Sequence, residues 1–462
     1  MNLSPYKDRF MRYSAPHNEK IRHATGTSSP IIRDTCLRPS CGARAQQQAS
    51  RPSLTRTDRR SGRKRFAISL CGVCLLAAGT TAQADISDNE VRIGLISDMS
   101  QSYRTVGEGA EIAVDMAIRD FGGEVLGRDI RVFIRDHQLD ADLAMEHARE
   151  LHEEHNVDMF LDMVGSHVAI PLQHYARENE IVTLHTSSVA SSLTGEHCSP
   201  YGAHWMFDTR GLAAGITSAL LEDGHESWQF LTADYSMGHS LEADSRAVIE
   251  QHGGTVTGSV MHPFQTDDLV GEILEVAASG ADVIALASAG DDTGRAVRTA
   301  YEMGIPEEDQ VIAALMTTED LPQELGLYVS QGLRLTTGWY WNLDDETREW
   351  AERFGTRSGL FGSQFSAGQY SAVKHYLRAV EAAGTDDAGA VMEQMRAMPV
   401  DDVYGRGARL REDGRLMIDM YLARVKSPAD STAPGDYYEI QGSIAPEDAF
   451  VPLEESDCPF LD

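Results

Sequence analysis

Hydroxyl-bearing and small residues gather in three short loops of this 462-residue chain, and each loop follows an apolar segment. The loops cover residues 97–107, 164–169 and 186–194. Hydroxyls, backbone N–H groups and the N-terminus of a following helix can together hold a carboxylate without a lysine or arginine. The other interpretation is that these residues are ordinary helix caps and turns. Under the first interpretation, the three loops form a binding site for a small anionic group.

Other residue patterns are weaker candidates for chemistry. His147, His152 and His155 share one predicted helix with several glutamates, but further ligands in register, which zinc requires, are missing. A solvated acidic helix face is therefore expected there. Residues 290–294 lack the lysine and the glycine spacing of a phosphate-binding loop, and no Gly-x-Ser-x-Gly motif of a hydrolase occurs. The sequence predicts no catalytic residue, no metal and no cofactor.

Apolar strand-like segments alternate with helical repeats along the chain. The predicted strands cover residues 91–96, 130–134, 159–161, 181–184, 228–231, 283–286, 311–315, 333–337 and 417–425. The predicted helices cover residues 110–121, 141–155, 212–221, 240–251, 293–303, 370–383 and 388–398. This alternation is typical of parallel sheets covered by helices, and about ten strands are too many for one sheet. The predicted fold class is α/β with two Rossmann-like lobes, in which ligands lie beyond the carboxyl ends of the strands.

The N-terminal region has the features of an export signal. The basic triplet Arg63-Lys64-Arg65 precedes the uncharged run 66–78, and Ala82-Gln83-Ala84 is a small-x-small cleavage site. These features predict a signal peptide at residues 61–84 that is cleaved after Ala84, and a periplasmic protein. Residues 1–60 are polar and rich in arginine without periodicity, so they are predicted to be a disordered or mispredicted extension.

The charge balance excludes some classes of partner. The whole chain has a formal net charge of −31. Without residues 1–84, 25 of the 40 basic and 67 of the 71 acidic residues remain, which gives a net charge of −42. Such a surface repels nucleic acid and anionic lipid. A saline habitat and a general acidic bias are both consistent with this composition.

Two of the six cysteines, Cys198 and Cys458, lie beyond the predicted cleavage site. An even number of cysteines in an oxidising compartment favours a disulfide, which would fix the C-terminal end of the chain. The alternative is a pair of free, buried thiols.

Several motifs resemble a known family. Asp98-Met99-Ser100 with Tyr103 follows the first strand, and Thr232-Ala233-Asp234-Tyr235-Ser236-Met237-Gly238 follows a later one. Cys198-Ser199-Pro200 and Asp457-Cys458-Pro459 are similar to a pattern of one branch of this family. Over nearly all of residues 88–458 the chain resembles the leucine/isoleucine/valine-binding proteins, which deliver small solutes to ABC transporters.

The resemblance implies a fold of two lobes with the ligand in the cleft between them. The N-terminal lobe would contain residues 88–205 plus 338–409, and the C-terminal lobe residues 206–337 plus 410–462. Three crossing strands near residues 204–208, 336–339 and 410–414 would form the hinge. The implied ligand contacts are Tyr103, Ser166, Ser187, Ser188, Tyr235, Asp291 and Phe365, with Phe365 as an apolar wall residue.

The chain differs from amino-acid-binding relatives at two places. Val189 stands where these relatives have a threonine, and Ala314-Leu315-Met316-Thr317 matches the stretch in which they place an acid for the ligand ammonium. Asp291 is a possible substitute for that acid. The predicted ligand is therefore an amino acid, an amide or a small aromatic or aliphatic carboxylate, which a monomer captures by lobe closure and passes to an inner-membrane permease. One alternative is a ligand-sensing receptor component, which would need a fused signalling domain. The other is a periplasmic α/β hydrolase, which would need a nucleophile–base pair.

Overall fold

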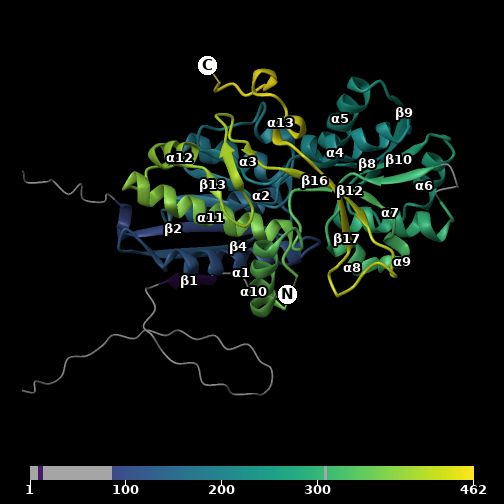
Figure 1. The fold of residues 1–462 in the computed structure, drawn as a ribbon. Helices are drawn as coiled ribbons and strands as arrows, with labels where there is room; N and C mark the ends of the chain where they lie inside the picture. The colour runs from purple at the N-terminus through teal and green to yellow at the C-terminus, as the bar shows by residue number, and fades with distance from the viewer. Residues whose placement is uncertain (1–8, 14–85, 306–309, 360, 462) are drawn as a thin grey trace, which may run out of the picture. The chain divides into compact units, whose positions relative to one another are not determined.

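Two largely parallel sheets carry the fold in the computed structural model, which describes residues 9–13, 86–305, 310–359 and 361–461 (Figure 1). The first sheet has the strand order β1-β4-β2-β5-β6-β7, and β3 also pairs with β4. The bounds of its strands are Arg9–Tyr13 (β1), Glu90–Ser97 (β2), Glu124–Val125 (β3), Arg128–Asp136 (β4), Met159–Asp162 (β5), Val182–His185 (β6) and Gly202–His204 (β7).

The second sheet has the order β17-β16-β12-β11-β10-β8-β9. Its strands are Ser227–Asp234 (β8), Thr255–Pro263 (β9), Val283–Ala287 (β10), Val311–Ala314 (β11), Arg334–Thr337 (β12), Met420–Val425 (β16) and Tyr438–Ile444 (β17). Only the pairings of β16 with β12 and with β17, at one edge, are antiparallel, so β16 runs opposite to the other strands of this sheet. A small third sheet consists of Val400–Asp401 (β13), Arg406–Leu410 (β14) and Leu416–Met417 (β15). The central strands β5, β6 and β10 are buried along their whole length, as expected for parallel strands with both faces covered.

Each sheet and its helices form one lobe. The first lobe contains Arg104–Phe121 (α1), Ala141–Glu153 (α2), Ser166–Glu178 (α3), Asp345–Ser358 (α10), Gln364–Ala383 (α11) and Ala388–Ala397 (α12). The second lobe contains Thr209–Glu222 (α4), Ser236–Gln251 (α5), Val270–Ala277 (α6), Gly290–Glu302 (α7), Asp320–Leu325 (α8), Leu327–Ser330 (α9) and Pro446–Ala449 (α13). The two-lobed α/β architecture predicted from the sequence is confirmed. The exact lobe boundaries stay a prediction.

Several helices begin earlier than the apolar spacing predicts. Helix α1 begins at Arg104 instead of residue 110, and α5 begins at Ser236 instead of residue 240. The first turn of each helix contains only one larger apolar residue, Val106 or Met237, among polar and small ones, and a single residue shows no apolar periodicity. The helices therefore start directly at the strand-end loops, and their N-termini lie next to the loops that the sequence analysis singled out.

The N-terminal region is described only at strand β1. The backbone of Arg9–Tyr13 pairs antiparallel with β4, from Arg9 opposite Ile134 to Tyr13 opposite Ile130. This strand differs from the sequence interpretation, which placed no regular structure in residues 1–60. The remaining parts of that segment and the predicted signal peptide at residues 61–84 lie outside the described residues.

The first and third predicted hinge crossings lie side by side. The His204 backbone N–H donates to the Gly414 carbonyl over 2.7 Å, and Arg415 donates to the His204 carbonyl over 2.6 Å. Gly414 has a φ of 87°, and a Cβ atom at this position would lie 2.5 Å from the Gly202 carbonyl oxygen. Glycine is therefore the residue that allows this close approach. Arg415 is fully buried and is paired with Asp208 over 3.2 Å.

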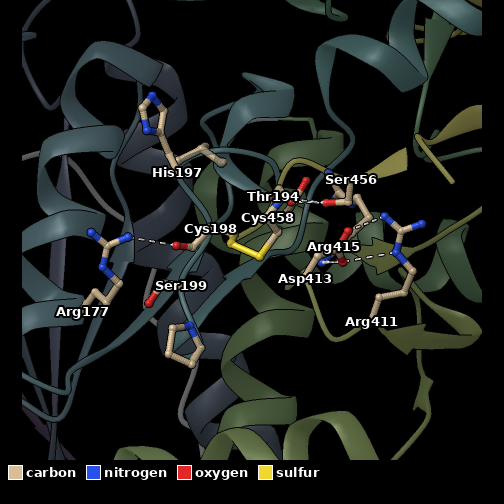
Figure 2. Close-up of a disulfide and its surroundings, with 12 residues drawn as sticks. Arg177, Thr194, His197, Cys198, Ser199, Arg411, Asp413, Arg415, Ser456 and Cys458 are labelled. Carbon is tan, nitrogen blue, oxygen red and sulfur yellow. Dashed lines mark hydrogen bonds and ion pairs between the residues drawn. A yellow bond between two sulfur atoms is a disulfide. The ribbon is translucent and has the colours of Figure 1, made fainter. Parts of the chain in front are cut away.

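A disulfide adds a covalent link beside the hinge (Figure 2). Cys198 and Cys458 are bonded, with their Cα atoms 5.5 Å apart, as predicted from the sequence. Arg177 of α3 donates to the Cys198 carbonyl, and the Ser456 hydroxyl donates to the Thr194 carbonyl (Figure 2). Because α13 packs on α4 of the second lobe, the C-terminal segment passes from the second lobe to the first.

Candidate functional site

A cavity of about 380 Å³ lies between the two lobes. Both lobes contribute side chains to its wall, which contains apolar and acidic groups. The lining residues are Ser102, Tyr103, Thr105, Val106, Ala289, Gly290, Asp291, Met316, Thr317, Thr318, Asp320, Leu321, Gln323, Glu324 and Phe365. Its volume is that of a small-molecule site, and its wall combines apolar side chains with many polar and acidic ones.

Tyr103 forms one wall of the cavity and touches the opposite lobe. It is the N-cap residue of α1, and the carboxylate of Asp98 accepts a hydrogen bond from its backbone N–H over 2.8 Å. The Tyr103 ring lies so close to Gly290 that a Cβ atom there would be 3.1 Å from the ring. Gly290 also has a φ of 56°, which favours glycine. Burial raises the pKa of the Tyr103 hydroxyl to about 12, so this group stays a neutral donor.

The cavity wall is acidic. Asp291, Asp320 and Glu324 line it, whereas no lysine, arginine or histidine is among its lining residues in the described part of the chain. Burial raises the pKa of Asp320, and its carboxylate accepts a hydrogen bond from the Thr105 hydroxyl of the other lobe over 3.4 Å. This arrangement favours a ligand group with a positive charge at this end of the cavity.

The serine-rich loops meet at a buried aspartate, Asp162, at the end of β5. Its carboxylate accepts hydrogen bonds from the side chains of Ser97, Thr186, Ser187 and Gln369. Burial raises the pKa of Asp162, and the four donors act in the opposite direction. The ends of β2, β5 and β6 are therefore tied together as predicted, but by a residue that the sequence analysis did not select.

The hydroxyl oxygens of the three predicted serines take part in hydrogen bonds within the protein. Ser166 accepts a hydrogen bond from the Ala190 backbone N–H over 3.1 Å, and Ser188 donates to the Met163 carbonyl. Ser187 donates to Asp162. Within the described residues, these three serines do not line the cavity. Their side chains hold the loops in position, and their role as ligand contacts stays a prediction.

The serine loops nevertheless lie close to the cavity. Phe365, which forms an apolar wall, and Gln369, which contacts both Asp162 and Ser187, are one turn apart on α11. Residues at this spacing lie on the same helix face, roughly 6 Å apart. Of the predicted contacts, Tyr103, Asp291 and Phe365 are brought together in the cavity. The Tyr235 hydroxyl lies near that of Tyr103, without a well-aligned hydrogen bond.

Asp320 and Glu324 of the cavity wall were not predicted from the sequence. A third acidic residue that was not predicted is Glu319. It stands between Thr318 and Asp320, which both line the cavity. Both of its carboxylate oxygens are buried without a hydrogen-bond partner among the described residues. The position of Glu319 in the sequence could have indicated this role, because it lies only two positions after the stretch from Ala314 to Thr317. An acid is therefore present close to the place where amino-acid-binding relatives were expected to have one.

The stability of the protein should depend on pH through Glu319. Burial raises its pKa from the ordinary glutamate value of 4.5 to about 8. The folded chain thus keeps this proton over a pH range in which the unfolded chain has released it. The contribution of Glu319 to the free energy of unfolding is complete below about pH 4.5, falls by about 1.4 kcal/mol per pH unit, and is lost above about pH 8.

Urea unfolding at several pH values between 4.5 and 8 measures this effect. Glu319→Gln, which mimics the protonated side chain, should remove this part of the slope relative to the unsubstituted protein. Equal slopes for the two proteins would show that Glu319 is ionised in the folded state.

The three histidines considered as metal ligands each contact another protein group through one ring nitrogen. The Nε2 atom of His147 contacts the Asp136 carbonyl, Nδ1 of His152 contacts the Tyr175 hydroxyl, and Nε2 of His155 contacts Glu150. Within the described ranges, no group of three or more potential ligands is arranged to hold a metal ion. The same ranges contain no helix with the length and apolar character of a membrane span.

Two lobes joined by a hinge, with a small cavity between them, define a binding protein that encloses its ligand. Residues 90–432 match the family model described as periplasmic binding protein. The chain belongs to the family of type I periplasmic binding proteins, which includes the leucine-binding type. It is a solute-binding protein of the ABC transporter family. This family binds small molecules outside the cytoplasm, works with membrane components of the transporter and is not enzymatic.

Solved structures of this family are similar over most of the chain. A periplasmic binding protein from Burkholderia mallei is 39% identical, with a TM-score of 0.79, and the match covers 81% of this chain and 100% of that chain. A branched-chain amino acid ABC transporter periplasmic ligand-binding protein from Burkholderia xenovorans is 34% identical, with a TM-score of 0.74 and coverage of 80% and 99%.

A solute-binding protein from Rhodopseudomonas palustris in complex with benzoate shares the fold at 18% identity, with a TM-score of 0.71 and coverage of 80% and 99%. A search of curated proteins finds no match.

Proposed function

We propose that this protein captures an apolar α-amino acid and delivers it to the membrane components of an ABC transporter. The acidic wall of the cavity carries this proposal. Asp291, Asp320 and Glu324 line the cavity, and Glu319 is buried beside it without a partner. A ligand ammonium group would pair with the carboxylates of this wall. Its positive charge would also favour the ionised form of Glu319 and so lower the raised pKa of this residue.

The remaining walls suit an apolar side chain. Tyr103 and Phe365 provide aromatic surfaces, and Val106, Met316 and Leu321 provide aliphatic ones. Burial of one leucine- or phenylalanine-sized side chain contributes about 1.5–3 kcal/mol. The likeness to the branched-chain amino acid binding protein of Burkholderia xenovorans supports the same class of ligand.

The ligand carboxylate is assigned to backbone N–H groups of the serine loops. In the described part of the chain, the N–H groups of Ser187 and Ser188 donate to no protein atom. Helix α3 begins at Ser166, and its N-terminus favours negative charge. The serine hydroxyls would then hold the loops in position, and the backbone would bind the carboxylate. Asp291 would act from the second lobe.

Thermal unfolding with pairs of ligands tests this proposal. L-Leucine and L-phenylalanine should raise the melting temperature, since ligand at 100 times Kd adds about 2.7 kcal/mol to the free energy of unfolding. Their deaminated analogues, 4-methylpentanoate and 3-phenylpropanoate, are matched controls that lack only the ammonium group. They should have no effect at the same concentration.

Equal stabilisation by the deaminated acids would contradict the assignment of the acidic wall. Stabilisation by benzoate or by an amide, with no effect of the amino acids, would identify a different ligand class.

A further inference from the structure

Three aromatic rings from both lobes meet beside the cavity. Tyr235 and Phe264 of the second lobe are stacked, with ring centroids 4.3 Å apart. His167 of α3, in the first lobe, lies edge-on to both rings, at 6.3 Å from Tyr235 and 6.1 Å from Phe264. Because the rings come from different lobes, these two edge contacts exist only when the lobes are closed.

Hydrogen bonds hold each side of this cluster in position. His167 contacts the Leu139 carbonyl over 3.0 Å through Nε2, which fixes the orientation of its ring. The turn after Phe264 is held by Asp292, whose carboxylate accepts from the Gln265 backbone N–H over 2.9 Å. Gln265 has a φ of 59°, and its side chain donates to the Ser102 hydroxyl of the first lobe over 3.2 Å.

We propose that His167, Tyr235 and Phe264 form an inter-lobe clamp that stabilises the closed protein and slows release of the ligand. The inference rests on the proposed function, because it assumes that closure encloses a ligand. The clamp residues lie outside the cavity lining of the described chain. They should therefore change the rate of ligand release more than the choice between ligands. Edge-to-face aromatic contacts of this kind are lost when the lobes open.

The first test is the dissociation rate of L-leucine and L-phenylalanine from the exported protein. His167→Ala and Phe264→Ala should each increase the rate by about 10-fold, with a smaller change in the association rate. The double variant should be less affected than the product of the two single effects, because both substitutions remove the same contact. Tyr328→Ala removes an exposed aromatic side chain elsewhere in the second lobe and should leave the rate unchanged.

Unchanged dissociation rates, or single effects that multiply fully in the double variant, would overturn the clamp. Failure of the unsubstituted protein to bind either amino acid would contradict the proposed ligand class instead. In that case, amide hydrogen exchange of the ligand-free protein tests whether the clamp residues are in contact. Phe264→Ala should increase exchange at residues 166–169 of the other lobe, and unchanged exchange there would refute the inter-lobe contact.

Discussion

Replacing Cys198 and Cys458 together by serine is expected to lower the free energy of unfolding by about 5 kcal/mol, the largest effect of any substitution considered for this protein. The two cysteines are 260 residues apart in the sequence, so the bond removes much of the conformational freedom of the unfolded chain. It also attaches the C-terminal segment of the second lobe to the first lobe (Figure 2). Loss of the bond should therefore also loosen residues 450–461.

Urea unfolding of the oxidised protein and of the double serine variant measures this loss. A reducing agent should bring the unsubstituted protein to the stability of the variant, while it leaves the variant itself unchanged. Ser199→Ala, next to Cys198, is a control for local packing and should have a much smaller effect. A difference below about 1 kcal/mol between oxidised protein and variant would contradict the entropic argument.

The sequence was sufficient to predict the fold because its parallel strands are short, apolar and separated by helices. The predicted strands at residues 91–96 and 283–286 lie within β2 and β10 of the structure. Strand β9 was not predicted, since it lies at a sheet edge and alternates exposed and partly buried residues from Thr255 on. Edge strands of this kind have no continuous apolar run to reveal them.

The site could be predicted only in part. Tyr103, Asp291 and Phe365 line one cavity, as expected for residues at strand ends and at the start of α11. Ser166 and Ser188 were chosen because hydroxyls can bind a carboxylate, but a hydroxyl binds a neighbouring backbone group equally well. The sequence does not reveal which partner is chosen, because that depends on the folded loops. For the same reason, Asp162 could not be assigned a role from the sequence.

Replacing Arg415 by alanine is expected to lower the free energy of unfolding by about 3–5 kcal/mol. The guanidinium is fully buried between two hinge segments, where it donates to the His204 carbonyl and to Asp208, and it lies 4.6 Å from the ring centroid of Phe450. Burial lowers the pKa of Arg415 and the Asp208 charge raises it again. The substitution would leave Asp208 as a buried charge without its cation, and that charge accounts for most of the expected loss.

Two further variants separate the charge effect from simple loss of packing. Arg424→Ala removes an arginine whose ion pair with Glu439 is exposed, so it should cost at most about 1 kcal/mol. The double variant Asp208→Asn, Arg415→Met should recover part of the stability lost in Arg415→Ala. Methionine fills the space without a charge, and asparagine can still accept the Gly211 backbone N–H that caps α4. If the double variant were less stable than Arg415→Ala in urea unfolding, the buried pair itself would be required at the hinge, and the loss could not be ascribed to an unpaired aspartate.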